Sequence, residues 1–471
     1  MQTVLESSIQ KLALAGEREE KKPNRMDTRQ NTFPGSGCSD FSYRDGMLHI
    51  EDVGLDDIAA AIPTPFYCYS SATLKSAYER LSAALAPVGA SICFAVKANG
   101  NLSILSLLAE LGSGMDIVSG GELERALASG VPGSGIVFSG VGKKRGEIVR
   151  ALEAGIHQIN VESPAELDAI AAISRELEVR APVALRVNPD VDARTHAKIS
   201  TGRKGDKFGI SSAEIPDLYA RAMAMPELEV VGLAVHIGSQ ILDLNPYREA
   251  YSHMASLVMA LRAQGLPVRH LDLGGGLGIS YDGGSGPDVA EYAAIIGETL
   301  GGIGCELTVE PGRWLVGPAG VLVSEVLYVK HPDDLSIAIV DAGMSDLMRP
   351  ALYGAVHSVL PARQGSTADA TPCRIVGPIC ESSDVFGTYD DMPTLRAGDL
   401  VAFTCAGAYG ASMASTYNGR DLVPEILVDG DRFRVIRRRQ TAIELLTLEE
   451  HTQWQKPVAD ATAGMVRAAG Q

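Results

Sequence analysis

Eight short apolar segments, separated by stretches of helical period, limit the folds open to this chain more than any other feature. The segments are rich in Ile and Val and span residues 92–98, 115–119, 136–140, 157–163, 182–188, 230–237, 270–276 and 306–313. Strands that alternate with helices predict a parallel sheet with helices packed on its faces. Eight units within about 220 residues favour a (β/α)8 barrel of the TIM type over an open doubly wound sheet, which rarely needs eight uninterrupted units.

The sequence on either side of these segments has a different pattern. Short strands separated by Pro, Gly and Asp turns predict a mostly β domain over residues 316–450. Residues 41–70 hold further strands outside the barrel pattern, and we expect them to pack with the β domain, which leaves residues 71–315 for the barrel. Residues 1–40 are polar and turn-rich and predict a flexible extension, and residues 451–471 form a C-terminal tail.

Charge and cysteine content exclude several classes of function. The net charge of −17 argues against a basic face for nucleic acid or for an anionic membrane. The chain has no uninterrupted apolar run of about 18 residues, so we expect no membrane span. The seven cysteines form no CxxC pair, a pattern typical of free thiols in a reducing compartment. We therefore expect a cytoplasmic protein without a metal site.

Two charged residues end apolar segments, at the strand ends where barrel enzymes carry their active sites. Lys97 lies between Val96 and Ala98 in the first segment. Its amine either reaches solvent at the strand end or is desolvated, with a lowered pKa and the ability to form a Schiff base. Glu310 ends the eighth segment. Its carboxylate lies where a cofactor bound at the strand ends should lie. Beside a cofactor with a pyridine ring, a carboxylate keeps the ring nitrogen protonated and makes the ring a better electron sink.

The ends of the sixth and seventh segments suit a flat ligand that carries an anion. His236 is either a core histidine or a ring that stacks on a flat cofactor, and Ser239 follows it with a hydroxyl. The glycine run 274–276 allows backbone amides to approach an anion closely. In barrels, the loops after strands seven and eight often bind phosphate.

Eight motifs then occur in an order that is typical of one enzyme family. They are FAVKANGN, GSGMDIVSGGEL, HIGSQ, LDLGGGLGISY, EPGR, DAGMSDLMRPALYGAVH, GPICESSD and GAYGASMASTYNGR. Over roughly residues 42–450, the chain resembles the diaminopimelate decarboxylases, which have the alanine racemase-like fold. The resemblance implies a barrel followed by a β domain, the cofactor pyridoxal 5′-phosphate, and decarboxylation of meso-2,6-diaminopimelate to L-lysine and CO2, the last step of lysine biosynthesis.

The resemblance also implies a role for each matching residue. Lys97 corresponds to the Schiff-base lysine, His236 to the histidine stacked on the ring, and Glu310 to the partner of the pyridine nitrogen. Further cofactor contacts correspond to Ser239, Gly275, Gly276, Pro311, Gly312, Arg313 and Tyr409. Residues that bind the substrate correspond to Arg313, Arg349, Tyr353, Glu381 and Tyr409, of which Arg313, Arg349 and Tyr353 bind its far end. Cys380 and Glu381 correspond to a pair supplied across the interface of a head-to-tail homodimer.

Several alternatives stay open at this point. Taken alone, Arg349 reads as a surface arginine, Cys380 as a small buried side chain and Glu381 as a rim charge. Either Cys380 or Lys97 returns the proton to the substrate carbon, and Cys380 is favoured. An ornithine, lysine, arginine or carboxynorspermidine decarboxylase of the same fold is the nearest alternative activity. A non-catalytic pyridoxal phosphate carrier or regulatory binding protein is the alternative from another class.

Overall fold

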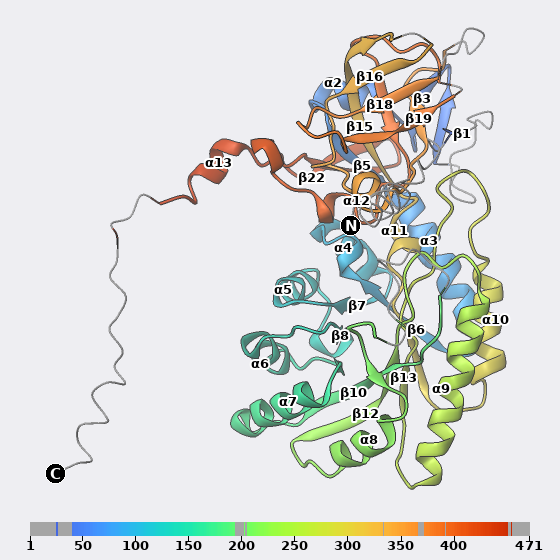
Figure 1. Ribbon diagram of the computed structural model, residues 1–471, viewed down its shortest axis with the longest axis vertical. Helices are drawn as coiled ribbons and strands as arrows, with labels where there is room; N and C mark the ends of the chain where they lie inside the picture. The colour runs from blue at the N-terminus through green and yellow to red at the C-terminus, as the bar shows by residue number, and fades with distance from the viewer. Residues whose placement is uncertain are drawn as a thin grey trace, which may run out of the picture.

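The computed structural model describes residues 25–26, 40–193, 202, 205–332, 334–365, 372–390, 392–450 and 454. Most of the predicted extension, 1–40, and of the predicted tail, 451–471, lies outside these residues. Figure 1 shows two regions stacked along the long axis of the molecule: helices surrounding a sheet in the lower region, and strands in the upper region.

The lower region is a closed barrel of eight parallel strands. They are β6 (Ala90–Ala95), β7 (Gly114–Ile117), β8 (Ile136–Phe138), β9 (Gln158–Val161), β10 (Ala181–Asn188), β12 (Leu228–Val235), β13 (His270–Asp272) and β14 (Glu306–Val309). Pairing of β9 with β10 and of β14 with β6 closes the ring, and the short β11 (Ile210–Ser211) is added beside β10. The predicted barrel is confirmed, and the open doubly wound sheet is excluded because that sheet has two free edges.

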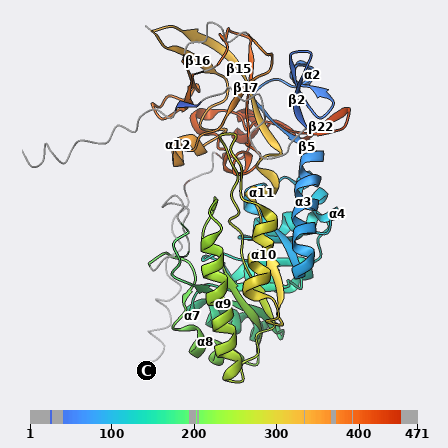
Figure 2. The same cartoon turned by 90° about the vertical axis from the view of Figure 1, so that its right-hand side faces the viewer.

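Helices cover the outside of the barrel (Figure 2). They are α3 (Ser71–Leu85), α4 (Leu102–Glu110), α5 (Gly120–Ala128), α6 (Arg145–Glu153), α7 (Pro164–Leu177), α8 (Ile215–Met223), α9 (Asn245–Ala263) and α10 (Val289–Leu300). Local sequence explains several of their starts. Ser119 and Ser163 accept hydrogen bonds from the backbone N–H groups of Glu122 and Glu166, three residues into their helices. Such caps satisfy backbone donors that a helix start leaves free.

The first barrel strand is shorter than the sequence predicts. β6 ends at Ala95, and Lys97 lies in a single 3₁₀ turn, Val96–Ala98, rather than in the strand. The neighbouring strand β14 already ends opposite Ile92. Beyond Ala95 the chain therefore has no ladder partner on that side, and it turns.

The upper region is mostly β. Its large sheet contains β1 (Arg25–Met26), β5 (Phe66–Ser70), β15 (Gly320–Lys330), β16 (Ser336–Val340), β17 (Val359–Pro361), β18 (Cys373–Val376), β19 (Val385–Tyr389), β20 (Leu400–Phe403), β21 (Glu425–Asp429) and β22 (Arg432–Arg437). β5 lies between β15 and β21, so a strand from before the barrel joins this sheet as predicted. The strands β2 (Phe41–Arg44), β3 (Met47–Ile50) and β4 (Val53–Gly54) form a small sheet of their own, and its buried side chains share one core with β5, β15, β20 and β21, so these strands pack with the β region as predicted.

Short helices complete the described chain: α2 (Leu55–Ala61), α11 (Arg313–Val316), α12 (Arg349–Tyr353) and α13 (Ala442–Leu446). α11 begins directly after the barrel strand β14, and α12 belongs to the β region. Within the described part of the chain, every helix is too short or too polar to span a lipid bilayer.

Candidate active site

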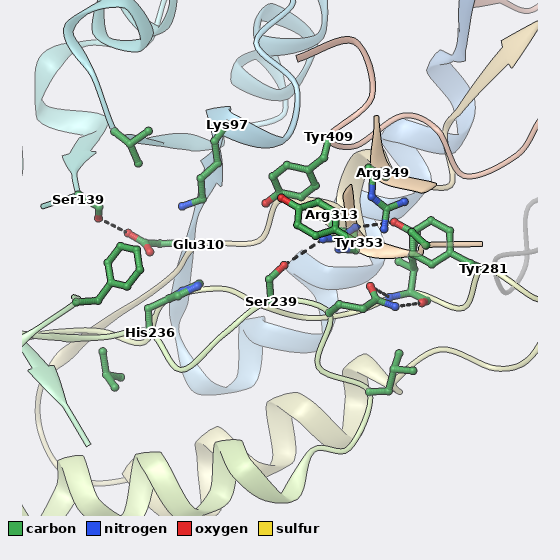
Figure 3. A pocket seen from close by; sticks show the side chains of 18 of the residues that line it. Lys97, Ser139, His236, Ser239, Tyr281, Glu310, Arg313, Arg349, Tyr353 and Tyr409 are labelled. Carbon is green, nitrogen blue, oxygen red and sulfur yellow. Dashed lines mark hydrogen bonds between the residues drawn. The ribbon is translucent and has the colours of Figure 1, made fainter. Parts of the chain in front are cut away.

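A cavity of about 1160 Å³ lies where the C-terminal ends of the barrel strands meet the β region. The barrel contributes the predicted residues Lys97, His236, Ser239, Glu310 and Arg313 to its lining, and the β region contributes Arg349, Tyr353 and Tyr409. Figure 3 shows Lys97, Glu310 and His236 at one end of the cavity, and Arg349 and Tyr281 at the other. The structure thus brings eight predicted site residues around one space.

Lys97 forms an ion pair at the floor of the cavity. Its Nζ lies 2.9 Å from Oδ2 of Asp116, a fully buried carboxylate on β7. Burial of the ammonium lowers the pKa of Lys97, but the nearby Asp116, Tyr409 and Glu310 outweigh it and raise this pKa above its ordinary value. The lowered pKa expected from the sequence is therefore wrong, because an isolated apolar strand end does not reveal a carboxylate on the next strand.

Glu310 belongs to a buried carboxyl pair. Burial, followed by the charges of Asp116 and Asp272, raises the pKa of Glu310 well above its usual range. Asp272, on the neighbouring strand β13, accepts hydrogen bonds from Nδ2 of Asn160 at 2.7 Å and from the N–H of Gly274 at 3.0 Å. These donors stabilise the charged form of Asp272. The proton of the pair therefore resides on Glu310.

His236 is held as a neutral ring. Its Nδ1 accepts a hydrogen bond from the backbone N–H of Gly275 at 3.1 Å, so the ring hydrogen lies on Nε2. Burial, with the charges of Arg186 and Lys97, lowers the pKa of His236 well below its ordinary value. The imidazole therefore adds no charge to a cavity that is already lined by four cationic side chains, Lys97, Arg186, Arg313 and Arg349.

The predicted glycine and proline contacts do not line the cavity themselves. Gly275 packs so closely that an added Cβ would lie 2.0 Å from the carbonyl oxygen of Glu310, and Gly276 has a φ of +104°. Gly312 fits against Ala98 and Ala95 in a similar way, with an added Cβ 3.0 and 3.1 Å from their Cβ atoms. These glycines allow the strand ends to approach each other closely, and they position the residues that do face the cavity.

Two arginines and a tyrosine form the other end. Arg313 donates from Nη1 to the hydroxyl of Tyr281 at 2.6 Å and from Nη2 to Oγ of Ser239 at 3.1 Å. The guanidinium carbon of Arg313 lies 4.7 Å from the centre of the Tyr409 ring, and that of Arg349 lies 4.4 Å from the centre of the Tyr281 ring. Stacked guanidinium groups of this kind are well suited to bind carboxylates and phosphates.

Cys380 and Glu381 do not reach this cavity within one chain. Both side chains are exposed. The backbone N–H of Cys380 donates to Oδ1 of Asn418 at 3.0 Å, and Glu381 accepts hydrogen bonds from Tyr417 and Ser383. A role in the site would therefore require them to come from a second copy of the chain.

Comparison with known proteins agrees with this geometry. Residues 71–317 match the family described as "Pyridoxal-dependent decarboxylase, pyridoxal binding domain". The chain is 49% identical over 410 residues to the diaminopimelate decarboxylase of Pseudomonas fluorescens, covering 87% of this chain and 98% of the relative. The chain belongs to the diaminopimelate decarboxylase family.

Solved structures of family members have the same fold. The Helicobacter pylori diaminopimelate decarboxylase, complexed with L-lysine, superposes with a TM-score of 0.80 at 42% identity and covers 83% of this chain and 98% of its own. The M. jannaschii diaminopimelate decarboxylase, also in complex with L-lysine, gives a TM-score of 0.83 at 36% identity, with 88% and 98% covered. Family membership makes this chain a pyridoxal-dependent carboxy-lyase.

The residues present fit pyridoxal 5′-phosphate. Lys97 offers an amine, His236 a flat neutral ring, and Glu310 an acidic group for the ring nitrogen. Nε of Arg313 and Oδ1 of Asp116 are buried and have no hydrogen-bond partner among the described residues. Since buried polar atoms rarely remain unpaired, these two atoms indicate that a polar ligand completes the site.

Several residues of the site escaped the sequence analysis. Asp116, Asn160, Arg186, Asp272 and Tyr281 line the cavity or pair with residues that do. Three of them lie within motifs that were recognised, GSGMDIVSGGEL and LDLGGGLGISY, so a search for charged and aromatic residues inside those motifs would have found them. Asn160 and Arg186 lie inside ordinary apolar strand patterns and give no such signal.

Proposed function

We propose that this chain decarboxylates meso-2,6-diaminopimelate to L-lysine and CO2, the last step of lysine biosynthesis. The observation that carries the proposal is the pair of arginines, Arg313 and Arg349, at the end of the cavity away from Lys97 and Glu310. A diamino acid with a carboxylate at each end can place one by the cofactor and the other between two guanidinium groups. Ornithine, lysine and arginine have no carboxylate at their far end.

Lys97 and His236 prepare the cofactor for the substrate. Lys97 Nζ would hold the aldehyde carbon of pyridoxal 5′-phosphate, and Asp116, 2.9 Å from this Nζ, would balance its charge whenever the nitrogen is protonated. His236 presents its ring face to the cofactor. Arg313 and Ser239 offer N–H and O–H donors to the phosphate, or to the far carboxylate in the case of Arg313. When bound, the cofactor ring supplies the electron sink that accepts the electron pair left by departing CO2.

Glu310 controls the protonation of the nitrogen in the cofactor ring. Burial and the neighbouring carboxylates raise the pKa of its carboxyl group well above the usual range, which favours the protonated form. A protonated Glu310 can pass this proton to the pyridine nitrogen and remain as its anionic partner. This arrangement favours decarboxylation over racemisation, for which a cationic partner that leaves the ring nitrogen unprotonated is better suited.

We also propose that the working form is a homodimer. Cys380 and Glu381 are exposed and outside the cavity of their own chain. Supplied by a second copy, Glu381 would bind the far ammonium of the substrate, and Cys380 would return a proton to the substrate carbon. Lys97, the alternative donor of this proton, lines the cavity of its own chain.

A cytoplasmic location is the last part of this proposal. The six cysteines of the described chain are all free thiols. Free thiols are typical of proteins in a reducing compartment.

A substrate panel tests the proposed activity. Purified protein with pyridoxal 5′-phosphate is incubated with meso-diaminopimelate, L-ornithine, L-lysine or L-arginine, and CO2 release is measured. We expect rates with the last three at least about a hundredfold lower, because each leaves the buried arginines unpaired. Comparable rates with ornithine would favour the alternative decarboxylase, and no CO2 from any substrate would favour a non-catalytic carrier. An Arg349→Gln variant serves as the control and should lose the preference for diaminopimelate.

A further inference from the structure

A buried histidine outside the cavity wall contacts one of the two arginines. His357 is 1% exposed and does not line the cavity. The five-residue helix α12 runs from Arg349 to Tyr353, and the next residue, Gly354, has a left-handed φ of 60° that turns the chain back. This turn brings His357 beside Arg349, with the His357 Nε2 2.7 Å from the Arg349 Nη1.

The partners of His357 allow one state of its ring. A guanidinium only donates hydrogen bonds, so the His357 Nε2 must accept from Arg349. The His357 Nδ1 lies 2.8 Å from the carbonyl oxygen of Thr404, which only accepts, so Nδ1 must carry the hydrogen. Burial, with the charge of Arg349, lowers the pKa of His357 to about 3, which agrees with a ring that stays neutral at physiological pH.

Two tyrosines fix the same arrangement from other directions. The Tyr281 ring lies edge-on to the His357 ring, with 5.0 Å between ring centres, and stacks on the Arg349 guanidinium at 4.4 Å. The hydroxyl of Tyr389 donates to the carbonyl oxygen of His357 at 2.9 Å. The guanidinium of Arg349 is thus held at one edge by His357 and on one face by Tyr281.

One N–H donor of this guanidinium lacks a hydrogen-bond acceptor among the described residues. Nε of Arg349 is buried and has no hydrogen-bond partner within the described part of the chain. Arg349 as a whole residue is only 5% exposed, yet it lines the cavity. An unpaired buried donor is costly unless a ligand supplies an acceptor.

We propose that His357 is a positioning residue that determines substrate selectivity, because it orients Arg349 toward the far carboxylate of the substrate. This inference rests on the proposed function. His357 itself does not touch the substrate; it occupies Nη1 and leaves the remaining donors of Arg349 for the ligand. Tyr281 assists His357, because its ring stacks on the Arg349 guanidinium and limits rotation of that group.

The test compares two ligands that differ only in the far carboxylate. L-Lysine, bound as product, keeps that carboxylate, whereas cadaverine lacks it. Both dissociation constants are measured by titrating the visible absorbance of the holoenzyme, for the wild type and for the variants His357→Phe and His357→Gln. Cadaverine binding in each variant controls for damage to the fold, and turnover of meso-diaminopimelate is measured separately.

We expect His357→Phe to raise the dissociation constant of L-lysine by about tenfold to a hundredfold, the range for a lost charge-assisted hydrogen bond, and to leave that of cadaverine within about threefold. His357→Gln, whose side-chain oxygen can accept from Arg349, should keep most of the difference between the two ligands. An unchanged L-lysine constant in His357→Phe, or an equal rise for both ligands, would overturn the positioning role. A wild type that prefers L-lysine to cadaverine yet gives no turnover would refute the proposed function alone.

Discussion

At the scale of single residues, the buried carboxyl groups of Asp116, Asp272 and Glu310 determine the protonation of the cavity floor. Oδ2 of Asp116 lies 2.9 Å from Nζ of Lys97. Burial raises the pKa of Asp272, but two N–H donors stabilise its charged form, and the pKa of the neighbouring Glu310 is raised well above its usual range, so the proton of this pair resides on Glu310. The site therefore carries its own proton for the cofactor ring and a charge partner for the lysine that the substrate displaces.

Replacing Glu310 by Gln tests this arrangement. The amide can still form a hydrogen bond but cannot deliver a proton to the ring nitrogen. We expect kcat for meso-diaminopimelate to fall by about a hundredfold to a thousandfold, as when a preorganised electrostatic group is removed, while the cofactor content stays near that of the wild type. Steady-state kinetics and the visible absorbance of the bound cofactor measure both quantities.

A matched control is Ser139→Ala, which removes the long 3.5 Å contact from the Ser139 hydroxyl to Oε1 of Glu310, together with a 3.0 Å hydrogen bond that this hydroxyl accepts from Nδ2 of Asn160, and leaves the Glu310 carboxyl in place. Its kcat should stay within about threefold of the wild-type value. If Glu310→Gln behaved like this control, the assignment of Glu310 to the ring nitrogen would be wrong.

At the scale of elements, the barrel strands carry a polar layer beneath the cavity. His270 on β13 is 4% exposed; its Nδ1 contacts Oε1 of Gln158 on β9 at 2.5 Å, and its Nε2 contacts Oγ1 of Thr308 on β14 at 2.9 Å. Burial, with the charge of His157, lowers the pKa of His270 from 6.5 to about 4. Between pH 6.5 and 4, His270 is therefore protonated in the unfolded chain but neutral in the native barrel. The free energy of unfolding falls as the pH falls from 6.5 toward 4.

His270→Gln should reduce this pH dependence. The shift corresponds to about 3 kcal/mol of unfolding free energy that is present above pH 6.5 and lost on acidification toward pH 4. We expect the variant to be less stable than the wild type at pH 7 and to lose less further stability on acidification, as measured by urea unfolding at several pH values. His331→Gln, at an exposed position, is the control. Parallel pH profiles for wild type and His270→Gln would contradict this account.

The sequence predicted these elements well because strand and helix periods are local properties. All eight barrel strands lie within or next to the predicted segments. The turn at Lys97 was missed because β6 ends where its neighbour β14 runs out, which depends on register between strands far apart in the chain. The raised pKa of Lys97 was missed for a related reason, since Asp116 belongs to another strand.

At the scale of the whole molecule, the site is assembled from both regions. Arg349, Tyr353 and Tyr409 belong to the β region, more than 250 residues after Lys97 in the chain, and no local pattern connects them to the barrel. From the sequence, only the resemblance to a family assigned these three residues to the same site as Lys97. His357 was missed although it ends the motif DAGMSDLMRPALYGAVH, because it acts through Arg349 and does not itself face the cavity.

The homodimer proposal can be tested by complementation. Lys97→Ala and Glu381→Gln each remove a different contribution to a shared site, and each variant alone should be almost inactive. After mixed dissociation and reassociation, an equimolar mixture should recover up to about a quarter of the wild-type sites, because half of the dimers are mixed and one of their two sites is intact. A mixture that is as inactive as either variant alone would contradict a site shared by Lys97 of one chain and Glu381 of the other.

The central claim is that this chain removes CO2 from meso-diaminopimelate by means of Lys97 and Glu310. Its most direct test is the product balance after purified protein, loaded with pyridoxal 5′-phosphate, has consumed a known amount of meso-diaminopimelate. We predict one CO2 and one L-lysine for each molecule consumed, and neither product with Lys97→Ala. Diaminopimelate returned with an inverted centre and no CO2, or normal turnover by Lys97→Ala, would contradict the account.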